Sequence, residues 1–305
     1  MQAVHSVDLL LAYDWPYDRP FVHLLGEVFA GRGLELLAVS PETLEQAFGD
    51  LQSGRVAARA FLDRASDTDS AFLPLESWAT ANVPLQLNPG PRRRQVWIKT
   101  NLHWEFIAAG IHTPHTLAIP SLKERPVLLE TPDLSPLGVP FSIKPDLGGG
   151  GWGVVTDAAG WSDVEAARKL YPEEDLILQA FIEPTVLHGR RAWFRVLYAC
   201  GEAFPCWWND RNRLFGPPVS VQDRQEFGLD ALWEIAQAAA RIAQLQLLSS
   251  EIARVEDGRF IVVDYANDPV DLRFQPHARE GMPPEVAGGV AEAIARFLQR
   301  SGLGA

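Results

Sequence analysis

Four consecutive glycines, Gly148 to Gly151, follow an apolar segment, Phe141 to Lys144, whose last residue is a lysine. A second strand-like segment, Gly153 to Val155, begins one residue after them. Glycine adopts backbone conformations that other residues avoid, so the pattern predicts two strands joined by a flexible hairpin. Backbone N–H groups in such a hairpin can approach a polyphosphate, and a strand lysine adds a positive charge. A mobile hairpin without a ligand fits this segment equally well when it is taken alone.

A second hairpin is predicted in the C-terminal third, where Asp257-Gly258 is a strong two-residue turn signal between apolar segments. We expect Glu256 to pair with Arg259 across this turn. Counting back along both strands then brings Glu251 opposite Asp264, on the same face of the sheet.

Side chains directly opposite one another in a sheet have Cβ atoms about 5 Å apart. Glu251 and Asp264 would therefore repel each other unless a cation lies between them, and magnesium is the predicted cation. Asn267 lies just beyond the second carboxylate and could supply a neutral oxygen to the same ion. A shifted register would instead turn Glu251 to solvent, where it would pair with an arginine.

The first part of the chain alternates short apolar segments with segments of helical spacing, which predicts βαβ units and a parallel sheet. The expected strands are Asp8 to Ala12, Leu34 to Val39, Ala58 to Asp63 and Val83 to Leu87, with a helix from Phe21 to Ala30. Ser40-Pro41 is a good helix start. Pro89-Gly90-Pro91 is interpreted as a domain boundary, and the basic run from Arg92 to Arg94 as a solvated linker.

Two common nucleotide motifs are missing. The loop after the first strand, Tyr13 to Asp18, has no glycine fingerprint, which disfavours a dehydrogenase. The glycine run also lacks the Gly-Lys-Ser/Thr of a Walker loop. Between the two hairpins, Leu176 to Glu183 reads as a buried strand that turns polar. Its backbone could offer a donor and an acceptor to a purine edge, although such segments are common in cores.

In their order along the chain, these segments resemble the ATP-grasp superfamily, in particular its glutathione synthetase-like carboxylate–amine ligases. The resemblance runs from Val96 to the C-terminus. It rests on the hairpin at Lys144, the strand ending in Gln179 to Glu183, Trp193-Phe194-Arg195, the hairpin carrying Glu251, Asp264 and Asn267, and a helix predicted from Val96 to Gly110. The implied fold is an α/β ATP-grasp fold with a small N-terminal parallel-sheet domain. The implied domains are residues 1–91, then 92–182 with the glycine-rich hairpin, then 183–305 with the metal site.

The resemblance also implies a role for each motif. Lys99 and Lys144 would contact ATP phosphates, and Gly148, Gly149, Gly150 and Gly151 would cover them. Gln179, Ala180, Phe181 and Ile182 would contact adenine, and Glu183 would reach the ribose. Glu251, Asp264 and Asn267 would hold Mg²⁺, or Mn²⁺ in its place. Arg195, acting with Lys144, would stabilise a phosphorylated intermediate, because most members activate a carboxylate as an acyl phosphate and pass it to an amine or thiol.

Two positions depart from the family pattern. Trp193 stands where many members have aspartate, and Asp264-Tyr265-Ala266-Asn267 is one residue longer than the usual acidic-x-Asn. A bulge could absorb the added residue, or Asp268 could replace Asn267 in the metal site. The leading hypothesis is a magnesium-dependent ligase that joins a small carboxylate to an amine. A phosphotransferase on the same fold and a nucleotide-binding protein without turnover stay open as alternatives.

The net charge and the residue composition disfavour some classes of binding partner. The formal net charge is −12, and nucleic acid or an anionic membrane would need clustered positive charge instead. A zinc hydrolase is disfavoured, because His112 and His115 have no further histidine or cysteine close in sequence. The N-terminal segment lacks a basic stretch followed by a long apolar one, and the chain has only two cysteines. We therefore expect a cytoplasmic protein with small-molecule substrates.

Overall fold

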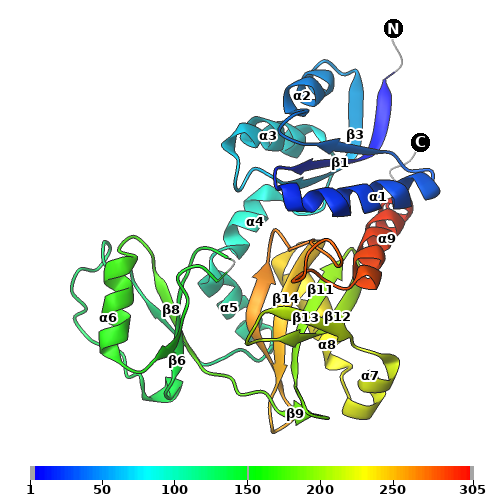
Figure 1. The fold of residues 1–305 in the computed structure, drawn as a ribbon. Helices are drawn as coiled ribbons and strands as arrows, with labels where there is room; N and C mark the ends of the chain where they lie inside the picture. Colours follow the sequence, from blue (N-terminus) through cyan, green and yellow to red (C-terminus); the bar gives the residue numbers. More distant parts are fainter. Residues whose placement is uncertain (1–3, 150, 303–305) are drawn as a thin grey trace.

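Three main β-sheets and the helices that cover them make up the chain (Figure 1), whose computed structural model describes residues 4–149 and 151–302. The N-terminal sheet is parallel, and the two later sheets are antiparallel. This is the mixed α/β architecture with an N-terminal parallel sheet that the sequence predicts. Among the described residues, no helix combines the length and apolar character needed to cross a membrane.

The N-terminal sheet has the strand order β2-β1-β3-β4. Its elements are β1 (His5–Tyr13), α1 (Arg19–Gly31), β2 (Leu36–Val39), α2 (Leu44–Gln52), β3 (Val56–Arg64), α3 (Leu73–Asn82) and β4 (Leu85–Gln86), with short 3-10 turns at Pro16–Asp18 and Ser70–Phe72. Helix α1 covers one face, and α2 and α3 cover the other. Burial on both faces explains the near-continuous apolar strands that made this sheet recognisable.

The helix start predicted at Ser40-Pro41 is wrong by a few residues. Residues Pro41 to Thr43 form a turn, and α2 begins at Leu44. The Ser40 backbone N–H donates to Thr43 Oγ1 at 2.9 Å, so the Thr43 side chain closes the turn instead of capping the helix.

The interpretation of the basic run from Arg92 to Arg94 as a solvated linker is also wrong. Helix α4 (Gly90–Val96) contains this run, and α5 (Lys99–Ala108) follows it after a break. Arg92 Nη2 donates to the Ile242 carbonyl at 2.6 Å, and Arg93 is 1% exposed. Only Arg94 projects towards solvent, so two of the three arginines join parts of the chain that are distant in sequence.

The middle sheet has the order β5-β8-β6-β7 and contains the glycine-rich hairpin. Its elements are β5 (Thr116–Ile119), β6 (Phe141–Pro145), β7 (Val155–Ala158), α6 (Trp161–Leu170) and β8 (Leu176–Ala180), with a 3-10 turn at Ser135–Leu137. Strands β6 and β7 pair antiparallel, as predicted, although β7 begins two residues later than expected. Helix α6 packs on the sheet through Val164 and Ala167.

The last sheet has five antiparallel strands in the order β13-β12-β11-β14-β15. Its elements are β11 (Trp193–Ala199), β12 (Glu202–Asn209), β13 (Leu214–Pro218), α7 (Val221–Phe227), α8 (Ala231–Ala243), β14 (Leu247–Arg254), β15 (Phe260–Asn267) and α9 (Pro284–Arg300), after a small β9–β10 pair (Val186–Leu187, Arg190–Arg191). Helices α5 and α8 cover one face. Helix α9 covers the end of the other face and also packs against α1 (Figure 1), so one apolar core joins this sheet to the N-terminal sheet.

Candidate functional site

Four of the predicted site residues, Arg195, Glu251, Asp264 and Asn267, lie on one face of the five-stranded sheet. Residues opposite each other on neighbouring strands point to the same face. One row across the sheet is Trp193, Ala253 and Ile261, and the next row is Arg195, Glu251 and Asp264. The opposite face is covered by the apolar core under α8. The row formed by Arg195, Glu251 and Asp264, the acidic row, therefore faces away from that core.

Glu251 lies opposite Asp264, as the sequence predicts, but the predicted turn is wrong. Val255 N–H donates to the Arg259 carbonyl at 2.9 Å, so the loop has three residues, and Gly258 takes a φ of +87°. Such a loop shifts every cross-strand pair next to it by one residue relative to a two-residue turn.

A bulge at Val263 cancels that shift. Ile252 faces Val262, whereas the next residue of β14, Glu251, faces Asp264. The extra residue on β15 moves the pairing back by one position, which restores the predicted pair. The two carboxylates therefore meet because two irregularities compensate each other.

Asn267 also reaches this row through a bulge. Ser249 pairs with Asn267, so β15 uses three residues where β14 uses two, and the added residue of Asp264-Tyr265-Ala266-Asn267 is absorbed as expected. Asn267 Nδ2 donates to Asp264 Oδ2 at 3.0 Å and to the Ser249 carbonyl at 3.3 Å. These contacts leave the amide oxygen of Asn267 for a ligand.

Glu251 is held by two donors from β11. Trp193 Nε1 donates to Glu251 Oε2 at 3.0 Å, and Arg195 Nη1 approaches Glu251 Oε1 at 3.4 Å. Burial raises the pKa of the Glu251 carboxyl, and the nearby Asp264 charge adds to the rise, while Arg195 and the indole N–H oppose it.

Arg195 is itself enclosed by aromatic rings. Its guanidinium carbon lies 4.9 Å from the ring centroid of Trp208 and 5.9 Å from that of Phe215. Its second nitrogen is 3.3 Å from Ser249 Oγ. Stacking on aromatic faces fixes the plane of the guanidinium, so Arg195 presents a rigid positive charge beside Glu251.

Lys144 extends from β6 of the middle sheet to β15. Its Nζ lies 3.4 Å from the Val263 carbonyl, one residue before Asp264. Burial lowers the pKa of the Lys144 ammonium, and the charges of Asp264 and Glu251 partly restore it. A half-buried lysine beside two carboxylates is therefore the link between the glycine-rich hairpin and the acidic row.

Lys99 lies at the start of α5 and binds the glycine-rich hairpin directly. Its Nζ donates to the carbonyls of Pro145 and Gly148, at 2.9 Å and 2.6 Å. Asp146 accepts from the Thr100 N–H at 2.7 Å, which attaches the end of β6 to the same helix end. Burial lowers the pKa of the Lys99 ammonium, against the opposing charge of Asp264.

Within the described part of the run Gly148 to Gly151, two glycines have a positive φ, which favours glycine. Gly148 has a φ of +113° and Gly151 of +76°, whereas Gly149 has no such strain and Gly150 lies outside the described residues. A Cβ added to Gly151 would lie 2.7 Å from Arg213 Nη1. Arg213, in the β12–β13 turn, therefore reaches across from the five-stranded sheet to the glycine-rich hairpin.

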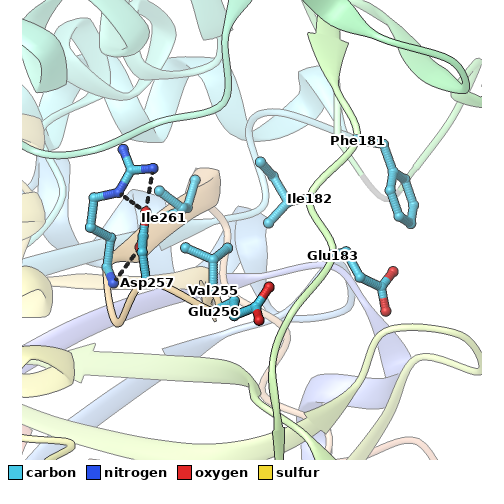
Figure 2. Close-up of a pocket in the computed structure, with 8 residues that line it drawn as sticks. Phe181, Ile182, Glu183, Val255, Glu256, Asp257 and Ile261 are labelled. Atoms are coloured by element: carbon cyan, nitrogen blue, oxygen red, sulfur yellow. Dashed lines mark hydrogen bonds and ion pairs between the residues drawn. The ribbon is translucent and has the colours of Figure 1, made fainter.

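A surface hollow lies on the acidic face of the sheet, towards the β14–β15 turn. It is lined by Phe181, Ile182, Glu183, Val255, Glu256, Asp257, Arg259 and Ile261 (Figure 2). Ile182 points towards Ile261 from the segment that follows β8, whereas Phe181 and Glu183 lie on the other side of that segment. Glu183 accepts from Arg191 at 2.5 Å, so it is already paired.

Gln179 and Ala180 lie deeper than the residues that follow them. The Gln179 side chain is 1% exposed and donates to Thr116 Oγ1 at 3.1 Å and to the Tyr265 hydroxyl at 2.6 Å. The Ala180 backbone N–H donates to the His115 carbonyl at 2.9 Å. The structure therefore brings Phe181 to Glu183 to the hollow and uses Gln179 and the Ala180 N–H in contacts between elements.

No family model matches the chain, and no curated protein matches it by sequence. A RimK domain ATP-grasp protein from Sphaerobacter thermophilus superposes with a TM-score of 0.58 and 18% identity, over 95% of this chain and 99% of its own. The ATP-grasp ligase PsnB, solved with a minimal precursor, Mg and ADP, gives 0.62 and 15%, over 96% and 100%. The D-alanine–D-alanine ligase from Bacillus anthracis, solved with ATP, gives 0.60 and 12%, over 98% of each chain.

The chain has the ATP-grasp fold. Because these matches cover nearly the whole chain, the N-terminal sheet belongs to the shared architecture together with the two antiparallel sheets. The ATP-grasp resemblance inferred from the order of the sequence motifs is confirmed at the level of the fold.

The acidic row of this ATP-grasp chain suits a magnesium ion that shares its coordination with another ligand. Within the described residues, no three His, Cys, Asp or Glu side chains come together as a metal site. Glu251, Asp264 and the Asn267 amide oxygen offer hard oxygen donors, but too few to enclose the ion. Magnesium takes about six oxygen ligands and commonly binds through one or two carboxylates plus phosphate oxygens.

Asp268, the predicted alternative to Asn267, has another role. Its carboxylate accepts from Arg93 Nε at 2.7 Å and from Asn88 Nδ2 at 2.6 Å, and it is 2% exposed. Asp268 therefore belongs to the contact between the N-terminal sheet and the ATP-grasp sheets.

Sequence reasoning missed the local roles of Trp193 and Arg213. Trp193 was interpreted as a departure from the family pattern, although its N–H binds Glu251. The signal that could have found it is the spacing Trp193-x-Arg195, which puts both donors on one strand face opposite Glu251. No sequence pattern pointed to Arg213, because its approach to Gly151 depends on how two sheets meet.

Proposed function

We propose that this chain is a magnesium- and ATP-dependent ligase that activates a carboxylate as an acyl phosphate and joins it to an amine or thiol acceptor. The observation that supports the proposal is the opposed pair Glu251 and Asp264, with Lys144 beside it and Arg195 on the same strand face. Structures that share the fold include ligases solved with ATP, and with Mg and ADP.

The hollow would bind the base of a nucleotide, and the acidic row would bind its phosphates through the metal ion. Val255 and Glu251 are four residues apart on one strand face, which is about 13 Å at the rise of a β-strand. An extended nucleoside triphosphate spans a distance of this order. The base would lie against Ile182 and Ile261, with Phe181 at the rim and Glu183 near the ribose, and the phosphates would lie towards Lys144 and the glycine-rich hairpin.

Each charged group then has a distinct task in the transfer. Magnesium, held by Glu251, Asp264 and Asn267, would neutralise charge on the phosphates. Lys144 and Lys99 would bind phosphate oxygens, and the backbone of the glycine-rich hairpin would exclude water. Arg195, fixed between aromatic rings, would stabilise the negative charge of the acyl phosphate until the acceptor displaces phosphate.

The decisive experiment incubates the protein with Mg-ATP and a panel of carboxylates and amines. ADP, free phosphate and new product masses are then measured. We expect ADP and free phosphate in equal amounts. We also expect a product whose mass equals the sum of the two substrates minus one water. ADP without free phosphate would indicate a phosphotransferase, and nucleotide binding without ADP would indicate a protein that binds but does not turn over. Either result contradicts the ligase.

A matched pair of lysine variants controls this assay. Lys144→Ala should lower ATP turnover by about 100-fold or more, because a buried phosphate contact acts in a site of low dielectric. Lys123→Ala removes a lysine whose side chain is 69% exposed and which pairs with Glu173, and should leave turnover unchanged. Equal turnover of Lys144→Ala and the parent would remove the mechanism.

We also propose that the two antiparallel sheets act as the two subdomains of the grasp, at residues 92–182 and 183–305, with residues 1–91 as the preceding domain. The three sheets lie within these limits, and the segment from Phe181 to Glu183 crosses from one sheet to the other. A cytoplasmic location is proposed with the same function, since ATP is the required substrate.

A further inference from the structure

Trp193 is a buried tryptophan whose only polar atom binds a carboxylate. Its side chain belongs to a small core with Trp208 and Ala253, and the residue is 8% exposed. The indole Nε1–H donates to Glu251 Oε2 at 3.0 Å. Tryptophan has one donor and no acceptor, so this bond is the full polar role of the side chain.

Glu251 is contacted from two sides by a single strand. Trp193 and Arg195 are two residues apart on β11, so both point to the face that carries Glu251. The indole occupies one carboxylate oxygen and the guanidinium approaches the other. A carboxylate has about four lone-pair positions, so two donors fix its plane and still leave positions for a cation.

The charge of residue 193 affects the repulsion between the nearby carboxylates of Glu251 and Asp264. An aspartate there, as in many ATP-grasp members, would add a third carboxylate next to Glu251 and Asp264. The indole instead offers a neutral donor to the same oxygen. It orients Glu251 without adding to the repulsion within the acidic row.

We propose that Trp193 is a positioning residue, which orients Glu251 through its indole N–H so that the carboxylate binds the divalent cation of the nucleotide complex. This inference rests on the metal site of the proposed function. Groups that orient metal ligands typically change metal affinity by about 10–100-fold when they are removed. A role in packing alone predicts no such change when a ring of similar shape replaces the indole.

The test measures binding of Mn²⁺, in the presence of a non-hydrolysable ATP analogue, by the electron paramagnetic resonance signal of free Mn²⁺. Trp193→Phe keeps a buried ring and removes the N–H. Trp207→Phe is the matched control, because Trp207 lies on the opposite face of the same sheet, is 4% exposed and donates to Asp223 at 3.3 Å. We expect Trp193→Phe to bind Mn²⁺ about 10-fold more weakly or worse, and Trp207→Phe to bind it like the parent.

A second measurement reports on the parent protein itself, and the variant serves only to assign a signal. In the parent protein with tryptophan labelled at the indole nitrogen, the Trp193 signal is identified as the one missing from Trp193→Phe. It should shift when Mg²⁺ is added with the ATP analogue, whereas the signal of Trp78, which lies on α3 and packs against the core of the N-terminal sheet, should not.

The outcomes separate this inference from the function on which it rests. If Trp193→Phe binds Mn²⁺ as tightly as the parent, or the Trp193 signal does not move, the positioning role is wrong and the proposed ligase stands. If the parent binds no Mn²⁺ with the nucleotide analogue, the metal site and the positioning role both fail.

Discussion

At the level of single residues, Asp264 makes one unfavourable and one favourable charge interaction. It lies opposite Glu251, which repels it, and it attracts the half-buried Lys144 ammonium, whose pKa its charge holds up against the lowering effect of burial. The two interactions act in opposite directions on the stability of the ligand-free protein. A cation and a polyphosphate would change this balance, because both partners of Asp264 would then gain a counter-charge.

Asp264→Asn should therefore separate stability from ligand binding. The lost repulsion and the lost attraction oppose each other, so the melting temperature without ligand should change little. The increase in melting temperature on adding Mg²⁺ and a non-hydrolysable ATP analogue should largely disappear, because one metal ligand is lost. Thermal unfolding with and without ligand measures both quantities. Asp230→Asn, at an exposed position just before α8, is the control and should keep the full increase.

At the level of elements, the glycine-rich hairpin is held from two sides. Lys99 binds its carbonyls from α5, and Arg213 reaches Gly151 from the β12–β13 turn. The sequence predicted the hairpin from its own local pattern, whereas Lys99 was named only through the resemblance to the ATP-grasp superfamily. It could not predict Arg213, since that contact needs the relative placement of two sheets.

Gly151→Ala should weaken ATP binding, because its backbone has a positive φ and the added Cβ would displace the Arg213 guanidinium. We expect the KM for ATP to rise by about 10-fold. Gly149→Ala is the matched control, since no atom lies within 4 Å of a Cβ built there. Steady-state kinetics of the two variants compare them. A larger effect at Gly149 would show that the Arg213 contact is not important for binding.

The two hairpins show how far local pattern carries a prediction. The sequence paired Glu251 correctly with Asp264, although it predicted the wrong turn and did not predict the bulge at Val263. The two errors shift the strand register by one residue in opposite directions, so the predicted pair is unchanged.

Helix α9 gave no comparable signal in the sequence. It contains Gly288 and Gly289, which lower helix propensity, and a Cβ at Gly289 would lie 2.6 Å from the Phe204 ring. The close packing of α9 on β12 therefore favours glycine at position 289.

A buried network joins α5 to β15 behind the acidic row. His103 Nδ1 lies 2.7 Å from the Tyr265 hydroxyl, which also accepts from Gln179. Burial, with a smaller effect from the nearby His115, lowers the pKa of the His103 imidazole to about 4 from an ordinary value of 6.5. His103 is therefore neutral in the folded protein at neutral pH.

Acid should destabilise the fold through this histidine. The unfolded chain takes up a proton near pH 6.5, whereas the folded chain resists it down to about pH 4. The contribution of His103 is thus fully present above pH 6.5 and is lost as the pH falls towards 4, by about 3 kcal/mol. Denaturant unfolding at several pH values, for the parent and His103→Gln, tests this. The variant should show a flatter pH dependence within that range, and parallel curves would contradict the assignment.

At the scale of the whole molecule, Arg93 connects the N-terminal sheet to the five-stranded sheet. Its guanidinium contacts Asp63 at 2.7 Å, Asp268 at 2.7 Å and Asp67 at 3.5 Å, and the side chains of Asp63 and Asp268 are buried. Asp63 lies on β3, and Asp268 directly follows Asn267, the last residue of β15 and a proposed metal ligand. The end of β15 is therefore held by a residue that the sequence presented as part of a basic linker.

Arg93→Met should destabilise the protein by about 3–5 kcal/mol, because it leaves three carboxylates without their shared positive partner in a buried site. Arg94→Met changes a neighbouring arginine that is half exposed and lies 3.4 Å from Glu76, and should cost no more than about 1 kcal/mol. Urea unfolding of the two variants measures the difference. If Arg93→Met were as stable as Arg94→Met, the N-terminal sheet and β15 would have to be held together by the apolar core around α9 alone, and the buried charges would be dispensable for the assembly of the site.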